Sequence, residues 1–221
     1  VLFLDEAAEF RKNVLQSLRE PAEERRIVIA RAGRTYWYPA DFQLVLAANP
    51  CPCGYFGHPT RMCTCSMAEV TRYWKRLGGP LMDRIDVRVR VDPRASDGSS
   101  RETESQDGLD GRGDAAESSE RMHGRIVEAT RRQRERYRDE PYSSNAGVPA
   151  SHLRRYARVS PENEDVVERA AEKLSLSSRA VVSVLRMART IADLDGSPDV
   201  HRQHLLEAVQ HRRLGEGHRW F

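Results

Sequence analysis

Two adjacent carboxylates, Asp5 and Glu6, directly follow the apolar residues Val-Leu-Phe-Leu at the start of the sequence. A short, continuously apolar run is typical of a parallel β-strand that is buried on both faces. Open α/β sheets bind ligands outside the carboxyl ends of their strands, so acids there can hold Mg²⁺ and orient the water that attacks a phosphate. The alternative is a core strand followed by the acidic first turn of a helix, which the helix dipole favours.

A second apolar run, residues 42–48, ends at Asn49 and Pro50. If this run is a neighbouring strand, Asn49 lies at the same sheet edge as the two acids, where its amide can hold the attacking water. An Asn-Pro turn without a ligand is the alternative, and for this dipeptide by itself it is the more common structure.

All four cysteines of the chain follow at once, as Cys51-Pro-Cys53 and Cys63-Thr-Cys65. Thiolates suit a tetrahedral zinc ion, and four of them make a closed, structural site. The spacing is tighter than is usual in zinc sites, so disulfides or free thiols are the alternatives, although a reducing cytoplasm disfavours disulfides. His58, between the two pairs, could replace one cysteine as a ligand, and a bystander role is the simpler interpretation.

Between the two apolar runs lies a predicted hairpin, residues 27–39, in which β-prone segments flank a glycine-containing turn. Arg31 and Arg34 stand at its tip, and a Tyr-Trp-Tyr run follows them. Arginines beside aromatic rings suit contact with the backbone and bases of single-stranded nucleic acid. A solvated hairpin without a ligand is the alternative.

The remaining pattern divides the chain into a mixed part and a helical part. Helices are expected at residues 9–20, which Pro21 closes, and at residues 67–77, and an alternating edge strand at residues 87–91. Arg84 stands near two aspartates, so an intramolecular ion pair is its simplest interpretation. Residues 94–120 have almost no apolar side chains, which predicts a disordered linker or insertion.

Beyond the linker the pattern is helical. Helices are expected at residues 126–138, at residues 161–174 with Ser160 as N-cap, from Ser177 onward, and after a Gly-Ser-Pro turn near the end. Arg179 and Arg186 share one face of the third of these helices. His201 and His204 have a spacing that could bind metal, but surface histidines on helices are far more common.

The bulk composition is that of a soluble, globular protein, with 39% hydrophobic and 31% charged residues. No apolar run approaches the ~20 residues that span a bilayer, and the start has no signal-peptide pattern. We therefore expect a cytoplasmic protein without a membrane partner. The net charge of +3 is too small to indicate a nucleic-acid partner by itself.

Several strings, taken in order, resemble the magnesium-chelatase-like YifB/ComM family of AAA+ ATPases. They are LFLDE, YPADF, AANPCPCGYFG, CTCS, RYWKRLGGPLMDRIDV and LSSRAVVSVLRMARTIADLDG. The resemblance covers nearly the whole chain except residues 96–120. It implies an α/β fold class, with part of a P-loop AAA+ core over residues 1–93. That core would contain a parallel sheet, a β-hairpin insert and a zinc loop at residues 51–65. An all-α lid domain over residues 121–221 would follow the linker at residues 94–120.

The resemblance also implies roles for single residues. Asp5 and Glu6 would be the Walker B pair, with Asp5 in the Mg²⁺ shell and Glu6 orienting water, and Asn49 would be sensor 1. Arg84 would be the arginine finger that reaches the γ-phosphate of a neighbouring subunit, and Arg179 would be sensor 2. Asp5, Glu6, Asn49 and Arg179 would together bind ATP with Mg²⁺. The hairpin with Arg31 and Arg34 matches the pre-sensor-1 hairpin, which points into the pore of related ring motors.

The implied function is that of the C-terminal portion of a homo-hexameric, ATP-dependent DNA motor, a branch-migration helicase of natural transformation that acts on single-stranded or branched DNA. No G-x-x-x-x-G-K-[ST] string occurs, so we expect the phosphate-binding loop upstream and these residues alone to be inactive. One alternative is a chelatase-type ATPase that drives metal insertion into a porphyrin, which the Cys-x-Cys loop disfavours. The other is a non-catalytic zinc-binding interaction module.

Overall fold

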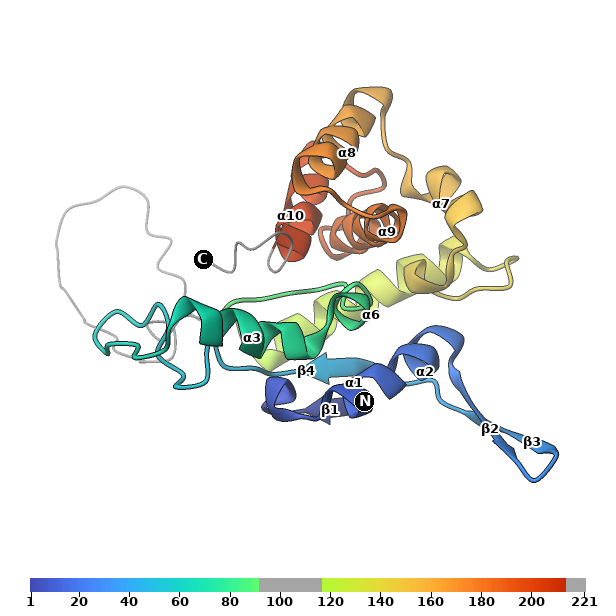
Figure 1. The fold of residues 1–221 in the computed structure, drawn as a ribbon. Helices are drawn as coiled ribbons and strands as arrows, with labels where there is room; N and C mark the ends of the chain where they lie inside the picture. Colours follow the sequence, from blue (N-terminus) through green and yellow to red (C-terminus); the bar gives the residue numbers. More distant parts are fainter. Residues whose placement is uncertain (92–116, 214–221) are drawn as a thin grey trace, which may run out of the picture. The chain divides into compact units, whose positions relative to one another are not determined.

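The computed structural model describes residues 1–91 and 117–213, which form two compact units (Figure 1). The first unit comprises residues 1–87, and the second begins at Arg88. Its elements in the first unit are β1 (Leu2–Leu4), η1 (Ala7–Glu9), α1 (Lys12–Ser17), α2 (Arg19–Glu24), β2 (Arg26–Arg31), β3 (Arg34–Pro39), β4 (Leu44–Leu46), α3 (Met67–Leu77) and α4 (Gly79–Met82). The second unit contains α6 (Ser119–Arg136), η2 (Asn145–Gly147), α7 (Ala150–Ala157), α8 (Pro161–Leu174), α9 (Ser178–Leu194) and α10 (Arg202–Arg213). Within these ranges, no helix has the length and apolar character needed to cross a membrane.

Strands β1 and β4 pair in parallel, as the sequence predicts, with Leu2 opposite Leu44 and Leu4 opposite Leu46. The leucines of both strands face the core of the first unit. The opposite face is open, because Phe3 is 58% and Val45 39% exposed. Burial on both faces, which the continuous apolar run predicts, is therefore not observed in the described residues.

Helix α3 packs against the chain that follows β1, and its bounds confirm the predicted helix at residues 67–77. The buried residues Val70, Tyr73 and Leu77 recur at helical spacing on one face. Ser66 caps the helix in a capping box, in which the Glu69 amide donates to Ser66 Oγ (3.3 Å) and the Ser66 amide donates to Glu69 Oε2 (2.8 Å). The helix therefore begins at a defined residue, immediately after Cys65.

The helix predicted at residues 9–20 is wrong in its bounds, because the chain forms two short helices there, α1 and α2. Pro21 lies in the first turn of α2 instead of closing a helix. A proline is tolerated in a first turn because the amide it lacks has no intrahelical partner at that position. Arg25, in the left-handed conformation with φ of 54°, ends α2.

The predicted hairpin is confirmed as the antiparallel pair β2 and β3, which projects from the rest of the first unit (Figure 1). Arg31 pairs with Arg34 across a two-residue turn. The turn residues Ala32 and Gly33 both have positive φ, 49° and 74°, as a type I′ turn requires. Nearly every side chain of the two strands is exposed, so packing against a core does not explain the aromatic run.

The edge strand predicted at residues 87–91 is wrong. The described residues of that segment form no strand, and Val89 and Val91 are 67% and 80% exposed. Instead, the Arg88 amide donates to the carbonyl of His211 near the end of α10 (3.1 Å). An alternating pattern produces a strand only where a partner strand offers a free edge, and here the neighbour is a helix end.

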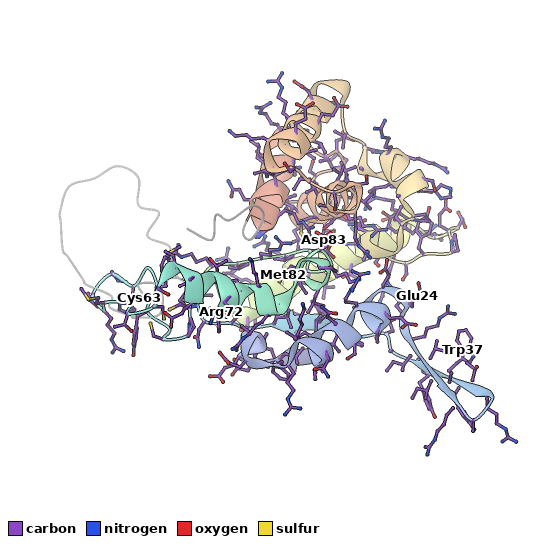
Figure 2. All side chains as sticks on the ribbon, viewed as in Figure 1. Glu24, Trp37, Cys63, Arg72, Met82 and Asp83 are labelled. Atoms are coloured by element: carbon purple, nitrogen blue, oxygen red, sulfur yellow. The ribbon has the colours of Figure 1, made fainter. Side chains whose placement is uncertain are left out.

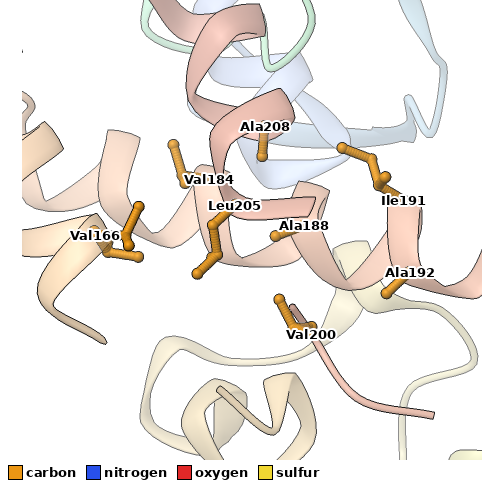
Figure 3. Close-up of a cluster of buried hydrophobic side chains, with 9 residues drawn as sticks. Val166, Val184, Ala188, Ile191, Ala192, Val200, Leu205 and Ala208 are labelled. Atoms are coloured by element: carbon orange, nitrogen blue, oxygen red, sulfur yellow. The ribbon is translucent and has the colours of Figure 1, made fainter. Parts of the chain in front are cut away.

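The second unit is built around α9, which contacts the other helices of the unit (Figure 1). Its core consists of small and branched apolar side chains from α8, α9, α10 and Val200 (Figure 3). The predicted helices at residues 161–174 and from Ser177 onward are confirmed as α8 and α9. Helix α7 is an addition that the sequence pattern did not predict. Helix α6 begins at Ser119, so the end of the linker predicted at residues 94–120 is wrong, and residues 94–116 of that linker lie outside the described residues.

A buried polar network fixes the C-terminal part of α9. The Asp193 carboxylate is fully buried, accepts hydrogen bonds from Arg136 and from Asn145 Nδ2 (2.9 Å), and forms an ion pair with Arg189 (3.1 Å). Arg189 also donates to the carbonyls of Ser197 (2.6 Å) and Pro198 (2.8 Å). Burial lowers the pKa of Arg189, and the charge of Asp193 opposes that shift. The segment between α6 and α7 therefore carries a structural residue, Asn145.

Candidate functional site

Asp5 and Glu6 leave the carboxyl end of β1 in an unusual turn. Glu6 adopts the left-handed conformation with φ of 49°, which is uncommon for a residue other than glycine. Its amide donates to Asp5 Oδ1 (2.9 Å), and both side chains are exposed. The turn thus presents two carboxylates to solvent at the end of a strand whose leucines are in the core.

Asn49 reaches the same edge from β4. Ala47 is hydrogen-bonded to the residues on both sides of the acidic pair. Its amide donates to the carbonyl of Leu4 (2.9 Å), and its carbonyl accepts from the amide of Ala7 (2.8 Å). Asn49 follows two residues later, with an exposed side chain. The structure therefore brings Asp5, Glu6 and Asn49 to the carboxyl ends of two paired parallel strands, as the sequence predicts for a ligand site.

Tyr73 of α3 lies beneath this edge. Its pKa is raised, first by burial and then by the negative charge of Glu9, while an interaction with the backbone of Asn49 opposes the shift. The charge of Glu6 also acts on it, more weakly. Because burial is the largest cause, the raised pKa marks Tyr73 mainly as a core residue, with the acids as a smaller contribution.

The cysteines form a second centre, in the loop between β4 and α3, where Cys63 lies near the N-terminal end of that helix (Figure 2). All four Sγ atoms lie within 4.8 Å of one another. Cys51 is 3.3 Å from Cys53 and 3.6 Å from Cys63. Sulfurs around a tetrahedral zinc ion with ~2.3 Å Zn–S bonds lie about 3.8 Å apart, whereas the two sulfurs of a disulfide lie ~2.05 Å apart. The four thiols are free, and their arrangement fits a metal ion rather than disulfides.

The thiols differ in acidity. A hydrogen bond to the backbone of Tyr55 lowers the pKa of Cys53 to about 6. For Cys65, a hydrogen bond to the backbone of Cys53 favours the thiolate, but burial and the sulfurs of Cys53 and Cys51 outweigh it and raise the pKa to about 12. The Cys53 thiolate is thus present near neutral pH, and binding of a cation would release the proton of Cys65.

The histidines considered as ligands have other partners. His58 Nδ1 accepts from the amides of Thr60 (3.2 Å) and Arg61 (3.1 Å), which fixes the turn of the cysteine loop. His204 Nδ1 accepts from the amide of His201 (2.9 Å), and its Nε2 lies 3.2 Å from Asp195. Both rings therefore support local backbone geometry.

The two arginines proposed by resemblance lie in different units. Arg84 forms an ion pair with Glu23 of α2, donates to the carbonyl of Pro80 (2.6 Å), and is 14% exposed. An ion pair is thus formed, but with a residue distant in sequence. Arg179 is the second residue of α9 in the second unit and is exposed. Arg186, on the same face of α9 as Arg179, donates to the carbonyl of Val148 (2.6 Å) and so has a structural role.

The register of the hairpin divides its side chains between two faces. Residues directly opposite in an antiparallel pair share a face, so Arg31 and Arg34 lie with Tyr36 and Tyr38. Trp37 (Figure 2) lies on the other face, where the guanidinium of Arg26 stacks 4.4 Å from its ring centre. The Tyr-Trp-Tyr run therefore does not act as one surface, and the arginine tip shares its face with the two tyrosines and not with the tryptophan.

Three residues contact these sites although the sequence pattern did not predict that role: Trp74, Tyr73 and Glu23. Trp74 Nε1 donates to the carbonyl of Pro50 (3.0 Å), between Asn49 and Cys51. The helical period marks Tyr73 as a core residue of α3, which is correct but incomplete. No pattern joins Glu23 to Arg84, because their pairing depends on how α2 packs.

Two family models match the chain: "Magnesium chelatase, subunit ChlI" over residues 1–99, and "Magnesium chelatase, subunit ChlI C-terminal" over residues 116–212. The chain is 36% identical over 215 residues to competence protein ComM of Haemophilus influenzae and to the uncharacterized protein YifB of Escherichia coli. The chain belongs to the magnesium-chelatase-like YifB/ComM family of AAA+ proteins. The matches cover 97% of this chain and 39% of each of those relatives, so this member of the YifB/ComM family spans about two fifths of their length.

Proposed function

We propose that the intact protein hydrolyses ATP with Mg²⁺ at the edge formed by Asp5, Glu6 and Asn49. The observation that carries the proposal is the convergence of these side chains at the carboxyl ends of the parallel strands β1 and β4. Phosphoryl transfer depends on positioning and on charge, and an exposed acidic pair beside an amide supplies both. Asp5 would hold the Mg²⁺ shell, and Glu6 with Asn49 would orient the attacking water.

Catalysis in this proposal requires neighbouring copies. Arg84 would serve as the arginine finger on a neighbour's γ-phosphate in a homo-hexamer, and Arg179 would act as sensor 2. Arg84 is held by Glu23 in the single chain, so it would have to exchange that carboxylate for a phosphate on assembly. Both ligands are anionic forks of the kind that guanidinium groups bind.

The proposed metal of the second centre is zinc, held by Cys51, Cys53, Cys63 and Cys65. The donor set and the sulfur separations support a closed, structural site. Zinc would replace the covalent crosslinks that a reduced, cytoplasmic protein lacks. Its chemistry would be confined to the loop, because a site with four protein ligands leaves no open position for a substrate.

DNA, single-stranded or branched, is the proposed client. The hairpin presents Arg31 and Arg34 beside two exposed tyrosines, and this face suits phosphates and unstacked bases. The name of one relative, a competence protein, fits a role in DNA transformation. The description of the matching family models favours a second candidate, a chelatase-type ATPase that drives metal insertion.

The experiment measures ATP hydrolysis by the intact protein with and without single-stranded and branched DNA. We expect DNA to stimulate hydrolysis, and Arg31→Ala/Arg34→Ala to remove the stimulation while leaving the basal rate. Arg121→Ala/Arg134→Ala on the exposed face of α6 removes the same charge and should change neither. Hydrolysis indifferent to every form of DNA contradicts a DNA motor, and hydrolysis that depends on a porphyrin and a divalent cation supports the chelatase-type candidate. Absence of ATP hydrolysis leaves the non-catalytic zinc module.

A further inference from the structure

We propose that the four-cysteine metal centre sets the position of Asn49, and that Trp74 of α3 is the positioning residue that joins the two. This inference rests on the proposed function, because it concerns the proposed nucleotide site and the proposed zinc. It adds a coupling between them, so that the state of one site changes the binding of a ligand at the other.

Asn49 lies between two anchors on the backbone. The upstream anchor is Ala47, whose amide and carbonyl are both hydrogen-bonded to the chain around Asp5 and Glu6. The downstream anchor is Cys51, a buried member of the cysteine cluster. Two residues span at most roughly 7 Å of chain, so the position of Cys51 limits where Asn49 can lie.

Trp74 connects the downstream anchor to helix α3. Its indole N–H donates to the carbonyl of Pro50, the residue between Asn49 and Cys51 (3.0 Å). The helix that carries Trp74 begins directly after Cys65, at the capping serine Ser66. A metal that bridges Cys51 and Cys65 therefore ties the start of α3 to the same stretch of chain that Trp74 holds from the middle of α3.

Helix α3 is in turn fixed to the acidic pair. Arg76 donates to the carbonyl of Ala8 (3.3 Å) and forms an ion pair with Glu9 (2.8 Å), both in the 3₁₀ turn after Glu6. Tyr73 packs in the same core as Ala7 and Ala8. With the metal bound, Asn49 is thus held against Asp5 and Glu6 from both sides. When the metal leaves, the downstream restraint is reduced to the hydrogen bond from Trp74 and to hydrogen bonds within the cysteine loop. In that loop the Cys51 carbonyl accepts from the amide of Gly54 (3.0 Å) and Cys51 Sγ accepts from the amide of Phe56 (3.3 Å).

Linkage makes the coupling reciprocal. If nucleotide fixes Asn49 through its amide, it must also favour the metal-bound loop, and the metal must favour nucleotide to the same degree. Trp74→Phe keeps an aromatic ring on α3 and leaves every proposed ligand in place, but it removes the donor to Pro50. We expect this variant to bind zinc and nucleotide and to lose the coupling between them.

The test uses the intact protein and measures its zinc affinity by equilibrium competition with a chromogenic chelator, with and without Mg²⁺ and a non-hydrolysable ATP analogue. In the wild type we expect the analogue to raise the zinc affinity by roughly 5-fold or more, the lower limit of common coupling energies. Trp37→Phe, on the hairpin, should behave like the wild type. Trp74→Phe should have a zinc affinity that the analogue no longer changes.

The outcomes separate the inference from the proposed function. A wild type that hydrolyses ATP but has the same zinc affinity with and without the analogue overturns the inference and leaves the function standing. A zinc-loaded wild type that neither binds nor hydrolyses ATP overturns both. Retention of the full analogue effect in Trp74→Phe overturns the role of Trp74. Because the wild-type comparison needs no variant, it decides the coupling even if Trp74→Phe does not fold.

Discussion

The two units use their polar side chains in opposite ways. In the second unit, Asp193 is fully buried and held by Arg136, Arg189 and Asn145, so its charge is committed to the fold. In the first unit, Asp5 is exposed at a strand end and its hydrogen bond is to the adjacent amide. The buried aspartate beside arginines thus stabilises the fold, whereas the exposed aspartate at the sheet edge is available to a ligand.

The means of stabilisation differ as well. The first unit gathers four thiols around a space that suits a cation, next to a two-stranded parallel sheet with one open face. The second unit relies on a helical core and a buried ionic network. Each unit should therefore respond to a perturbation that leaves the other unchanged.

Removal of the metal should have the largest effect. Structural zinc contributes about 10–16 kcal/mol to folding in small zinc-finger peptides, so a strong chelator should destabilise the first unit severely. We expect amide hydrogen exchange in α3 to accelerate by orders of magnitude while exchange in α9 stays constant. Equal acceleration in both helices would contradict the separation of the two units, and no acceleration would contradict a structural metal.

Asp193→Ala should produce the converse result. It leaves two arginines without their buried counter-ion, and breaking a buried pair in this way costs about 3–5 kcal/mol. We expect faster amide hydrogen exchange in α9 and an unchanged exchange rate in α3, both measured on the same protein. Asp165→Ala, which removes an exposed i,i+4 partner of Arg169 on α8, is the matched control and should stay within about 0.5 kcal/mol of the wild type.

The smallest effects should come from the helix caps, one in each unit. Ser66 caps α3, and Ser177 Oγ accepts from the amide of Ala180 at the start of α9 (3.2 Å). Replacement of either serine by alanine should cost about 1 kcal/mol in the free energy of unfolding. Because Ser66 follows Cys65 directly, Ser66→Ala should also accelerate zinc release, and Ser177→Ala should not. Equal zinc release in the two variants would show that the cap and the metal centre are independent.

Structural features that depend on neighbouring residues could be predicted from the sequence. The helical pattern predicted the bounds of α3, and a glycine turn between β-prone runs predicted the hairpin. Two closely spaced cysteine pairs predicted the cluster, and polar residues after two apolar runs predicted that Asp5, Glu6 and Asn49 share an edge.

Features that depend on packing were not readable. Val89 and Val91 alternate as in a strand, but no strand edge lies beside them in the described residues. The partner of Arg84 is Glu23, and the partner of the Pro50 carbonyl is Trp74, each distant in sequence. Asn145 belongs to no motif of the sequence, and its buried role depends on the position of Asp193 on α9.

The most direct test of the account is the turnover of Mg²⁺–ATP by the intact protein with Glu6→Gln. This change keeps the size of the side chain and removes the carboxylate that would orient the attacking water. We predict unchanged nucleotide affinity and a kcat lower by about 10²–10⁴-fold, the usual contribution of a general base. A kcat equal to that of the wild type would contradict the assignment of this sheet edge as the site of hydrolysis.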